Sequence, residues 1–289
     1  METSKRLTAK AVSLFFGFLH KFSYFCTVKE MEHITEPVAA ELAAFEAFFE
    51  QSLKSDTEPM NSIMHYVGAT KGKRLRPILV LLSAKLLGEV NEKTLRAATF
   101  VEMVHSATLI HDDVVDGSDL RRGQASVKMQ FGDLSAVLSG DYLLSKAILL
   151  IANDTDILNE MLRTTAAMSE GELMQSIVTD CVSQSENPTK YLDIITRKTA
   201  LLMRSCCVAG AFSVNANEEQ IRQMADFGLN FGILFQLRDD ILDGENTEIA
   251  QALLPVYLEK TLVALRSFPF SETLKVMNEL TVFCAERQG

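Results

Sequence analysis

Apolar side chains recur at helical spacing along most of this chain. Between residues 36 and 53 they stand at positions 38, 42, 45, 49 and 53, and Pro37 occupies a first-turn position. The same periodicity predicts further helices over 76–88, 91–116, 130–152, 157–183, 188–212, 218–243, 249–267 and 271–287. Helices therefore account for almost the whole chain after residue 36.

Helix-start signals support two of these boundaries. Asn187 is followed by Pro188 in a first-turn position, and NEEQ (217–220) has the form of a capping box. No alternating run is long enough for a sheet, and no linker or short repeat divides the chain. Several helices are apolar nearly all round, which is typical of a bundle with more than four helices. The sequence predicts one all-α domain over residues 31–289.

The first 30 residues have a different character. No acidic residue lies between Glu2 and Glu30, whereas basic residues are frequent, and the apolar run 11–19 is too short for a membrane span. The segment fits a signal peptide without a clear cleavage site, or a basic amphipathic anchor at a membrane surface. It also fits residues ahead of a translation start at Met31. We assign it no catalytic role.

Composition narrows the function classes. The chain has 289 residues, of which 47% are hydrophobic, so it can bury a large core and is not a disordered protein. A formal net charge of −10 argues against a nucleic-acid partner. The five cysteines form no CxxC or Cys/His metal spacing, which favours a reducing, cytoplasmic compartment and a use as small core residues.

Two acidic clusters with the same spacing carry the candidate chemistry. Their members are Asp112, Asp113 and Asp116 in HDDVVDG, and Asp239, Asp240 and Asp243 in RDDILDG. On a helix, Asp112 and Asp116 share a face and Asp113 is displaced to the side. One such cluster is commonly a solvated helix end. Two clusters, each ending a mostly apolar helix, predict Mg²⁺ ions that hold a diphosphate.

Cationic residues alternate with these clusters along the chain. They are Lys73, Arg74 and Arg76 in GKRLRP, Arg121 and Arg122 after the first cluster, and Lys198 in TRKTALL. His105 precedes Asp112 by two helical turns and lies on the same face. A lone basic turn is usually solvated and a lone histidine is usually a core residue. The alternation instead predicts two anion sites, one held through metal and one through direct cation contacts.

Together these motifs resemble a known family. GKRLRP, HSATLIHDDVVDGSDLRRG, GDYLL, GELMQ, RKTALL and FGILFQLRDDILD occur in the order seen in trans-isoprenyl diphosphate synthases, the polyprenyl synthetase family, over roughly residues 31–245. The resemblance implies a large all-α bundle around a deep central cavity, usually in a homodimer. It also implies Mg²⁺-dependent head-to-tail condensation of isopentenyl diphosphate with an allylic diphosphate.

The resemblance also implies a role for each matching residue. Those that look like Mg²⁺ ligands are Asp112, Asp116 and Asp239, supported by Asp113, Asp240 and Asp243. Those that resemble contacts to the allylic diphosphate are Arg121 and Lys198, with Thr199 and Gln236 nearby. Those that resemble the isopentenyl diphosphate site are Lys73, Arg76, His105 and Arg122. No protein nucleophile is required, because the departing diphosphate can take the proton that the reaction releases.

The residues one turn from Asp112 bear on product length. They are Ala107 and Thr108, and both are small. In short-chain members of the family, a bulky aromatic near this position resembles a floor that stops chain growth. Its absence here favours a medium- or long-chain polyprenyl product.

The sequence departs from the family pattern after the second acidic cluster. The family follows it with a loop of the kind GKxxGxDLxxGKxTLP, which supplies a further lysine, whereas here Lys260 lies in a helical pattern. Besides an active synthase, the sequence fits a weakly active or non-catalytic subunit that pairs with a complete homologue. A terpene cyclase-like enzyme is a further alternative. Intact GKRLRP, His105 and Arg122 argue against the cyclase, because a cyclase has no second diphosphate to hold.

Overall fold

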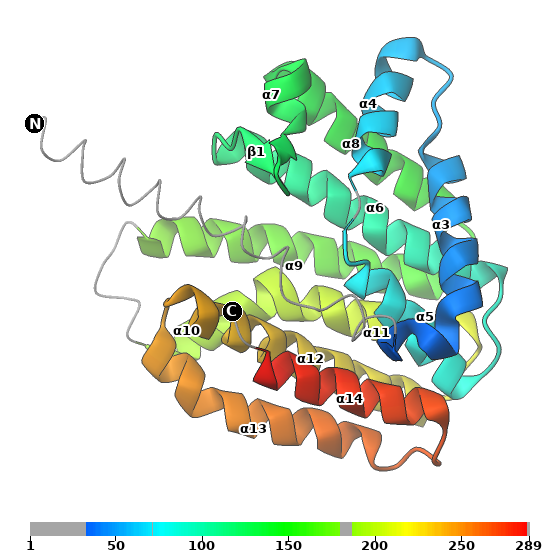
Figure 1. Cartoon of the computed structure of the whole chain (residues 1–289), viewed down its shortest axis with the longest axis vertical. Helices are drawn as coiled ribbons and strands as arrows, with labels where there is room; N and C mark the ends of the chain where they lie inside the picture. Colours follow the sequence, from blue (N-terminus) through cyan, green and yellow to red (C-terminus); the bar gives the residue numbers. More distant parts are fainter. Residues whose placement is uncertain (1–32, 71, 180–186, 288–289) are drawn as a thin grey trace, which may run out of the picture.

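Helices make up almost all of the chain that the computed structural model describes, which is residues 33–70, 72–179 and 187–287 (Figure 1). In the first half they are the 3₁₀ turn η1 (Glu36–Val38), α3 (Ala39–Leu53), α4 (Glu58–Ala69), α5 (Leu75–Leu87), α6 (Glu92–Val115), α7 (Val127–Phe131) and α8 (Asp133–Leu150). In the second half they are α9 (Thr155–Thr179), α10 (Pro188–Ile195), the π-helix η3 (Thr196–Ala200), α11 (Leu201–Ser213), α12 (Glu218–Asp243), α13 (Thr247–Leu265) and α14 (Glu272–Glu286). The all-α prediction is confirmed.

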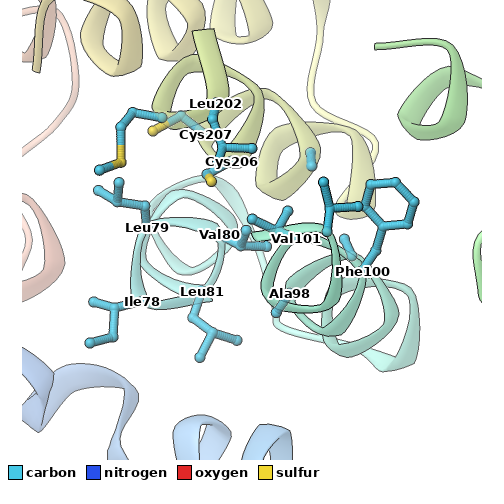
Figure 2. Packing of buried hydrophobic residues seen from close by; sticks show 14 of the residues in the cluster. Ile78, Leu79, Val80, Leu81, Ala98, Phe100, Val101, Leu202, Cys206 and Cys207 are labelled. Carbon is cyan, nitrogen blue, oxygen red and sulfur yellow. The ribbon is translucent and has the colours of Figure 1, made fainter. Parts of the chain in front are cut away.

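The core lies where α11 meets α5, α6, α9 and α12. Figure 2 shows side chains of α5, α6 and α11 packed together, with Cys206 of α11 next to Val80 of α5. α5 and α11 are buried nearly all round, as their continuous apolar sequences require. Gly210 of α11 lies against the backbone of α5, so the two helices approach closely. This core fixes the axes of the helices whose ends carry the acidic clusters.

Helix caps explain several boundaries. The Asn187 side chain accepts hydrogen bonds from the first turn of α10, and Asn217 forms a capping box with Gln220 at the start of α12. Both predicted starts are confirmed. A capping box of Asn91 and Thr94 also starts α6, the helix that carries the first acidic cluster.

Two predicted helices are divided in the structure, and one helix was not predicted. The segment 130–152 is two helices, because Gly132 has φ +87° and interrupts the helical backbone between α7 and α8. The segment 188–212 contains a π-helical turn between α10 and α11. The sequence analysis missed α4, although Pro59 in its first turn was an available signal.

A two-stranded hairpin interrupts the helices after α6. β1 (Leu120–Arg121) pairs antiparallel with β2 (Gln124–Ala125), and the turn residues Arg122 and Gly123 both have positive φ. Turns of this kind favour glycine, and they match the twist of paired strands. The strands are too short to form a layer of the fold. The turn, however, makes the side chains of Arg121 and Arg122 point in different directions.

The sequence also led to expectations about the cysteines, about membrane spans and about residues 1–30. Cys206, Cys207 and Cys284 are buried and unpaired, which confirms their use as core residues, whereas Cys26 and Cys181 lie outside the described residues. In the described ranges no helix has both the length and the apolar character that crossing a bilayer requires. The expectations for residues 1–30 also fall outside the described residues.

Candidate active site

The first acidic cluster lies at the C-terminal end of α6. Asp112 and Asp116 are partly exposed, and their side chains accept no hydrogen bond from the part of the chain that the structure describes. Asp113 is buried and forms a salt bridge with Arg121. The helical spacing therefore places Asp112 and Asp116 on one face and turns Asp113 toward the protein interior, as the sequence predicted.

The β1–β2 turn sends the two neighbouring arginines in different directions. Arg121 Nε lies 3.0 Å from Asp113 Oδ1 and ties the hairpin to α6. Arg122 has φ +52° at the turn and donates to the carbonyl of Thr70 at 3.5 Å. Its guanidinium lies over Gly72, where any side chain would collide with it. Arg121 thus belongs to the acidic cluster and Arg122 to the GKRLRP turn.

The second acidic cluster lies at the C-terminal end of α12, and other parts of the chain contact two of its members. Asp239 is buried and forms a salt bridge with Arg287, which follows α14. Asp240 is also buried; it accepts hydrogen bonds from the Tyr191 hydroxyl at 2.5 Å and from Gln236 Nε2 at 2.8 Å. The sequence analysis named neither Tyr191 nor Arg287.

Lys198 lies between the two acidic clusters. Its positive charge lowers the pKa of Asp112, Asp116 and Asp240, opposing the effect of burial on each, so one ammonium group is close to both clusters. Lys198 Nζ also lies 2.9 Å from Glu172 and 2.8 Å from Gln175. Both partners belong to the GELMQ motif of α9. That motif therefore orients the lysine.

Glycines on both sides leave room for the π-helix that carries Lys198. A Cβ atom on Gly171 of α9 would lie 2.8 Å from the Cβ of Arg197, and one on Gly232 of α12 would lie 2.5 Å from the Cα of Ala200. These distances are too short for any larger residue. Thr199, in the same turn, donates to Gln236 Oε1 at 2.8 Å. Close packing thus places Lys198 and Thr199 at the end of α12.

Excess negative charge marks the end of α6. Burial raises the pKa of Asp112 to about 6, and the charge of Glu172 adds to the rise. Burial raises the pKa of Asp116 as well, again with a contribution from Glu172. Because proximity penalises ionisation of both carboxylates, a bound cation would be stabilising here.

Arg76, His105 and Arg122 form a cationic group apart from the acidic clusters. Arg76 Nη1 lies 2.9 Å from His105 Nε2, and desolvation together with the charges of Arg76 and Arg122 lowers the pKa of His105 well below its usual value. Arg76 Nε is buried without a hydrogen-bond partner. Arg76, His105 and Arg122, which the resemblance assigns to one substrate site, therefore lie near one another, and their role in binding stays a prediction. Lys73 lies in the same turn, three residues before Arg76.

Arg74 differs from its neighbours in this turn. It is buried with φ +53°, and it bonds to Glu102 at 2.6 Å and to Glu46 at 2.9 Å. Its guanidinium also lies 4.7 Å from the centroid of the Phe49 ring. Arg74 therefore fixes the turn, while Arg76 and Arg122 keep donors for an anion.

The donor set fits Mg²⁺ when a substrate supplies further oxygens. Asp112 and Asp116 share a face without side-chain hydrogen-bond partners in the described chain, and Asp239 Oδ2 is buried without one. Within residues 33–70, 72–179 and 187–287, no three acidic, histidine or cysteine side chains converge on one point. Mg²⁺ commonly takes one or two carboxylates together with phosphate oxygens and water. Such a set matches each cluster.

The two small residues that favour a longer product lie one turn before Asp112 in α6. Ala107 is fully buried in the core, and Thr108 is partly buried with its hydroxyl donating to the carbonyl of His105 at 2.9 Å. Their role in product length stays a prediction.

Comparison with known proteins decides the family. The family model described as polyprenyl synthetase matches residues 57–251. The chain belongs to the polyprenyl synthetase family. It is 37% identical over 193 residues to the octaprenyl diphosphate synthase of Haemophilus influenzae, covering 66% of this chain and 58% of that protein. It is 33% identical over 210 residues to heptaprenyl diphosphate synthase component 2 of Geobacillus stearothermophilus, covering 72% of this chain and 65% of that protein.

A solved member of the family has the same fold. The polyprenyl synthase of Caulobacter crescentus, in complex with calcium and isoprenyl diphosphate, matches with a TM-score of 0.77 and 26% identity, covering 90% of this chain and 98% of that one. The chain spans 58% to 65% of the length of the two curated relatives above. In place of the family loop after the second cluster, α12 ends at Asp243 with Gly244 as its cap, and α13 begins at Thr247 and packs along α12.

Proposed function

We propose that this protein condenses isopentenyl diphosphate head-to-tail with an allylic diphosphate and makes a medium- or long-chain all-trans polyprenyl diphosphate. The main support is the position of Lys198 between two acidic clusters, with the Arg76–His105–Arg122 group as a separate cationic site. Two diphosphate substrates need two anion sites of this kind. The printed name of the Haemophilus influenzae relative, octaprenyl diphosphate synthase, supports the longer product.

The allylic diphosphate binds between the acidic clusters in this proposal. Lys198 and Arg121 contact its oxygens directly, and Thr199 and Gln236 lie beside it. Asp112, Asp116 and Asp239 hold Mg²⁺, with Asp113, Asp240 and Asp243 in supporting positions. When bound, Mg²⁺ supplies positive charge that stabilises the departing diphosphate. The apolar side chains of α6 and α12 that precede the acidic clusters keep water away from the allylic cation.

Isopentenyl diphosphate binds at the cationic site. Lys73, Arg76 and Arg122 contact its phosphates, and the neutral His105 donates a ring N–H or accepts from Arg76. The allylic C–O bond breaks and its electron pair leaves with the diphosphate. The isopentenyl double bond then forms the new C–C bond, and loss of one proton to the departed diphosphate restores a double bond.

Product analysis tests this function. The full chain, with Mg²⁺ and isopentenyl diphosphate, is given dimethylallyl, geranyl, farnesyl or geranylgeranyl diphosphate in separate reactions, and the dephosphorylated products are sized. A ladder that ends at one medium or long length is the expected result. A folded chain that binds diphosphate but extends none of these starters would contradict it.

A second candidate is a subunit that needs a different chain for activity. The missing loop after α12 favours it, as does the printed name of one relative, heptaprenyl diphosphate synthase component 2. The two acidic clusters and the cationic group favour an active chain instead. In the assay above, elongation only after a complete homologue is added would identify the subunit.

We also propose that the protein acts as a homodimer in the cytoplasm. α8 presents an apolar face to solvent, with Leu134 74% exposed, Leu138 51% exposed and Leu149 72% exposed. A second copy that covers this face would remove it from water. Residues 1–30, which are basic and apolar, or the product itself would supply any contact with a membrane.

A further inference from the structure

Both oxygens of Asp240 are held by the protein, as are those of Asp113 in the first cluster. Tyr191 donates to Oδ2 at 2.5 Å and Gln236 donates to Oδ1 at 2.8 Å. The carboxylate is 7% exposed, and the Tyr191 side is buried as well. Asp112 and Asp116, in contrast, have no such partners in the described chain. A carboxylate with both oxygens occupied is poorly suited to bind a metal directly and well suited to fix its neighbours.

The two donors connect Asp240 to one segment of the chain. Tyr191 lies in α10, seven positions before Lys198 in the sequence. The Gln236 amide links Thr199 to Asp240. Its Oε1 accepts a hydrogen bond from Thr199 at 2.8 Å, and its Nε2 donates to Asp240 Oδ1. The segment that carries Lys198 is therefore attached to Asp240 from both ends.

The electrostatics of the pair agree with this geometry. Burial raises the pKa of Asp240, while the hydrogen bonds from Tyr191 and Gln236 lower it and favour the ionised form. Burial and the charge of Asp240 raise the pKa of Tyr191, which favours the neutral phenol that donates to Asp240. An ionised carboxylate and a neutral phenol make a strong, short hydrogen bond.

We propose that Tyr191 is a positioning residue, which fixes Asp240 and thereby holds the second acidic cluster against the segment that carries Lys198. Asp239 and Asp243 flank Asp240 on the same turn of α12, so fixing Asp240 sets the orientation of both. Tyr191 acts through Asp240 and touches no substrate. This inference rests on the proposed function, because its effect is read from metal and diphosphate binding.

The test is Tyr191→Phe in the full chain, which removes the hydroxyl and keeps the ring. Mg²⁺ is titrated by calorimetry in the presence of inorganic diphosphate, and thermal unfolding without Mg²⁺ checks that the variant is folded. We expect the apparent affinity for Mg²⁺ with diphosphate to fall about 10-fold. In turnover assays, KM for the allylic substrate rises while KM for isopentenyl diphosphate is unchanged. A purely structural defect would affect both substrates alike.

Other variants make the outcome decisive. Thr199→Val removes the hydroxyl at the opposite end of the connection and should weaken Mg²⁺ binding as well, whereas Thr199→Ser should retain it. Tyr142→Phe is the matched control, because its hydroxyl bonds to the carbonyl of Lys54 at 3.3 Å on an exposed surface. Tyr191→Phe with unchanged affinity would overturn this inference alone. An unmodified chain that binds no diphosphate with Mg²⁺ would overturn the proposed function as well.

Discussion

At the residue scale, neighbouring residues of the same type have different tasks. Arg74 is buried between two glutamates, whereas Arg76 contacts His105 and keeps donors for an anion. Asp113 pairs with Arg121, whereas Asp112 keeps a raised pKa and no side-chain partner in the described chain. The difference follows from where each side chain points. A charged side chain that points into the bundle must have a partner within the protein, whereas one that points into the proposed site can pair with a bound ligand.

His105 should make stability depend on pH. Its pKa in the folded protein is well below the unfolded value of 6.5, so the unfolded chain binds the additional proton. The free energy of unfolding is therefore highest above about pH 6.5 and falls by up to about 1.4 kcal/mol for each pH unit below it. His105→Gln should reduce this loss, measured by urea unfolding at about pH 5.5 and 7.5. His65→Gln, at an exposed position, is the control; an equal pH dependence in all three proteins would contradict the prediction.

Arg287 should compete with metal at the second acidic cluster. Its guanidinium forms a buried pair with Asp239, and removing one member of such a pair costs about 3–5 kcal/mol. Arg287→Gln should therefore lower the melting temperature without metal and increase the stabilisation that Mg²⁺ and diphosphate give. Thermal unfolding with and without both ligands measures this. Arg222→Gln breaks an exposed pair with Glu219 on the same helix and should change neither value.

Equal ligand stabilisation in the Arg287→Gln variant and the unmodified chain would contradict this prediction. It would mean that the Arg287–Asp239 pair persists when metal is bound, so that Asp239 serves as a structural anchor like Asp113.

Ala107→Phe should shorten the product. Ala107 is fully buried one turn from Asp112, and in the proposed function a phenyl ring there narrows the path of the growing prenyl chain. Sizing of the dephosphorylated products should show a ladder that ends earlier. Thr108→Phe provides a second variant at a partly exposed position, in case the ring at 107 disrupts folding. An unchanged product length in both variants would contradict the hypothesis that small residues at positions 107 and 108 allow a longer product.

At the element scale, close contacts place the functional groups. The π-helix η3 fits between α9 and α12 because Gly171 and Gly232 present no side chain. Gly140 of the GDYLL motif similarly leaves room for His111, whose ring nitrogen lies 3.2 Å from the carbonyl of Val137. The glycines of the GDYLL and GELMQ motifs thus allow close packing around His111 and around the turn that carries Lys198.

Gly232→Ala tests this packing. The new methyl group would lie 2.5 Å from the Cα of Ala200, so α12 and the π-helix must separate. We expect a loss of about 1–3 kcal/mol in the free energy of unfolding and a higher KM for the allylic substrate. Urea unfolding and steady-state kinetics measure the two effects. Asp226→Ala, at an exposed position of α12, should change both little.

At the scale of the whole molecule, the bundle brings distant helix ends together, and in the part of the chain that the structure describes α8 has an exposed apolar face. The acidic clusters end α6 and α12, more than a hundred residues apart in the sequence, and Lys198 is close to both. The exposed leucines of α8 are not among the residues that form this site. A dimer through this face would bury apolar surface.

Glutamates on that face should separate the proposed dimer. Leu134→Glu with Leu138→Glu places two like charges where two copies would meet. Light scattering coupled to size exclusion should give half the mass of the unmodified protein. Val256→Glu, at an exposed position of α13, is the control and should leave the mass unchanged. An unmodified protein that is already monomeric would contradict the dimer itself.

The sequence by itself determined the features that depend on local geometry. Helical periodicity gave the all-α class and most boundaries, Asn caps marked helix starts, and the i, i+4 relation set Asp112 on the face of Asp116 and apart from Asp113. Family motifs indicated the cationic group of Arg76, His105 and Arg122. The helical features are fixed by residues within a few helical turns, whereas the cationic residues come from three separate segments and were associated through the family resemblance.

Only the tertiary structure decided which side chains hold the site residues in place. Tyr191 and Asp240 are 49 positions apart, and Arg287 and Asp239 are 48 apart, so no local rule relates them. The π-helical turn and the role of Glu172 beside Lys198 likewise depend on how α9, α11 and α12 pack. The helical pattern states which faces are apolar, but the angles and contacts between helices follow from the packing of all their side chains together.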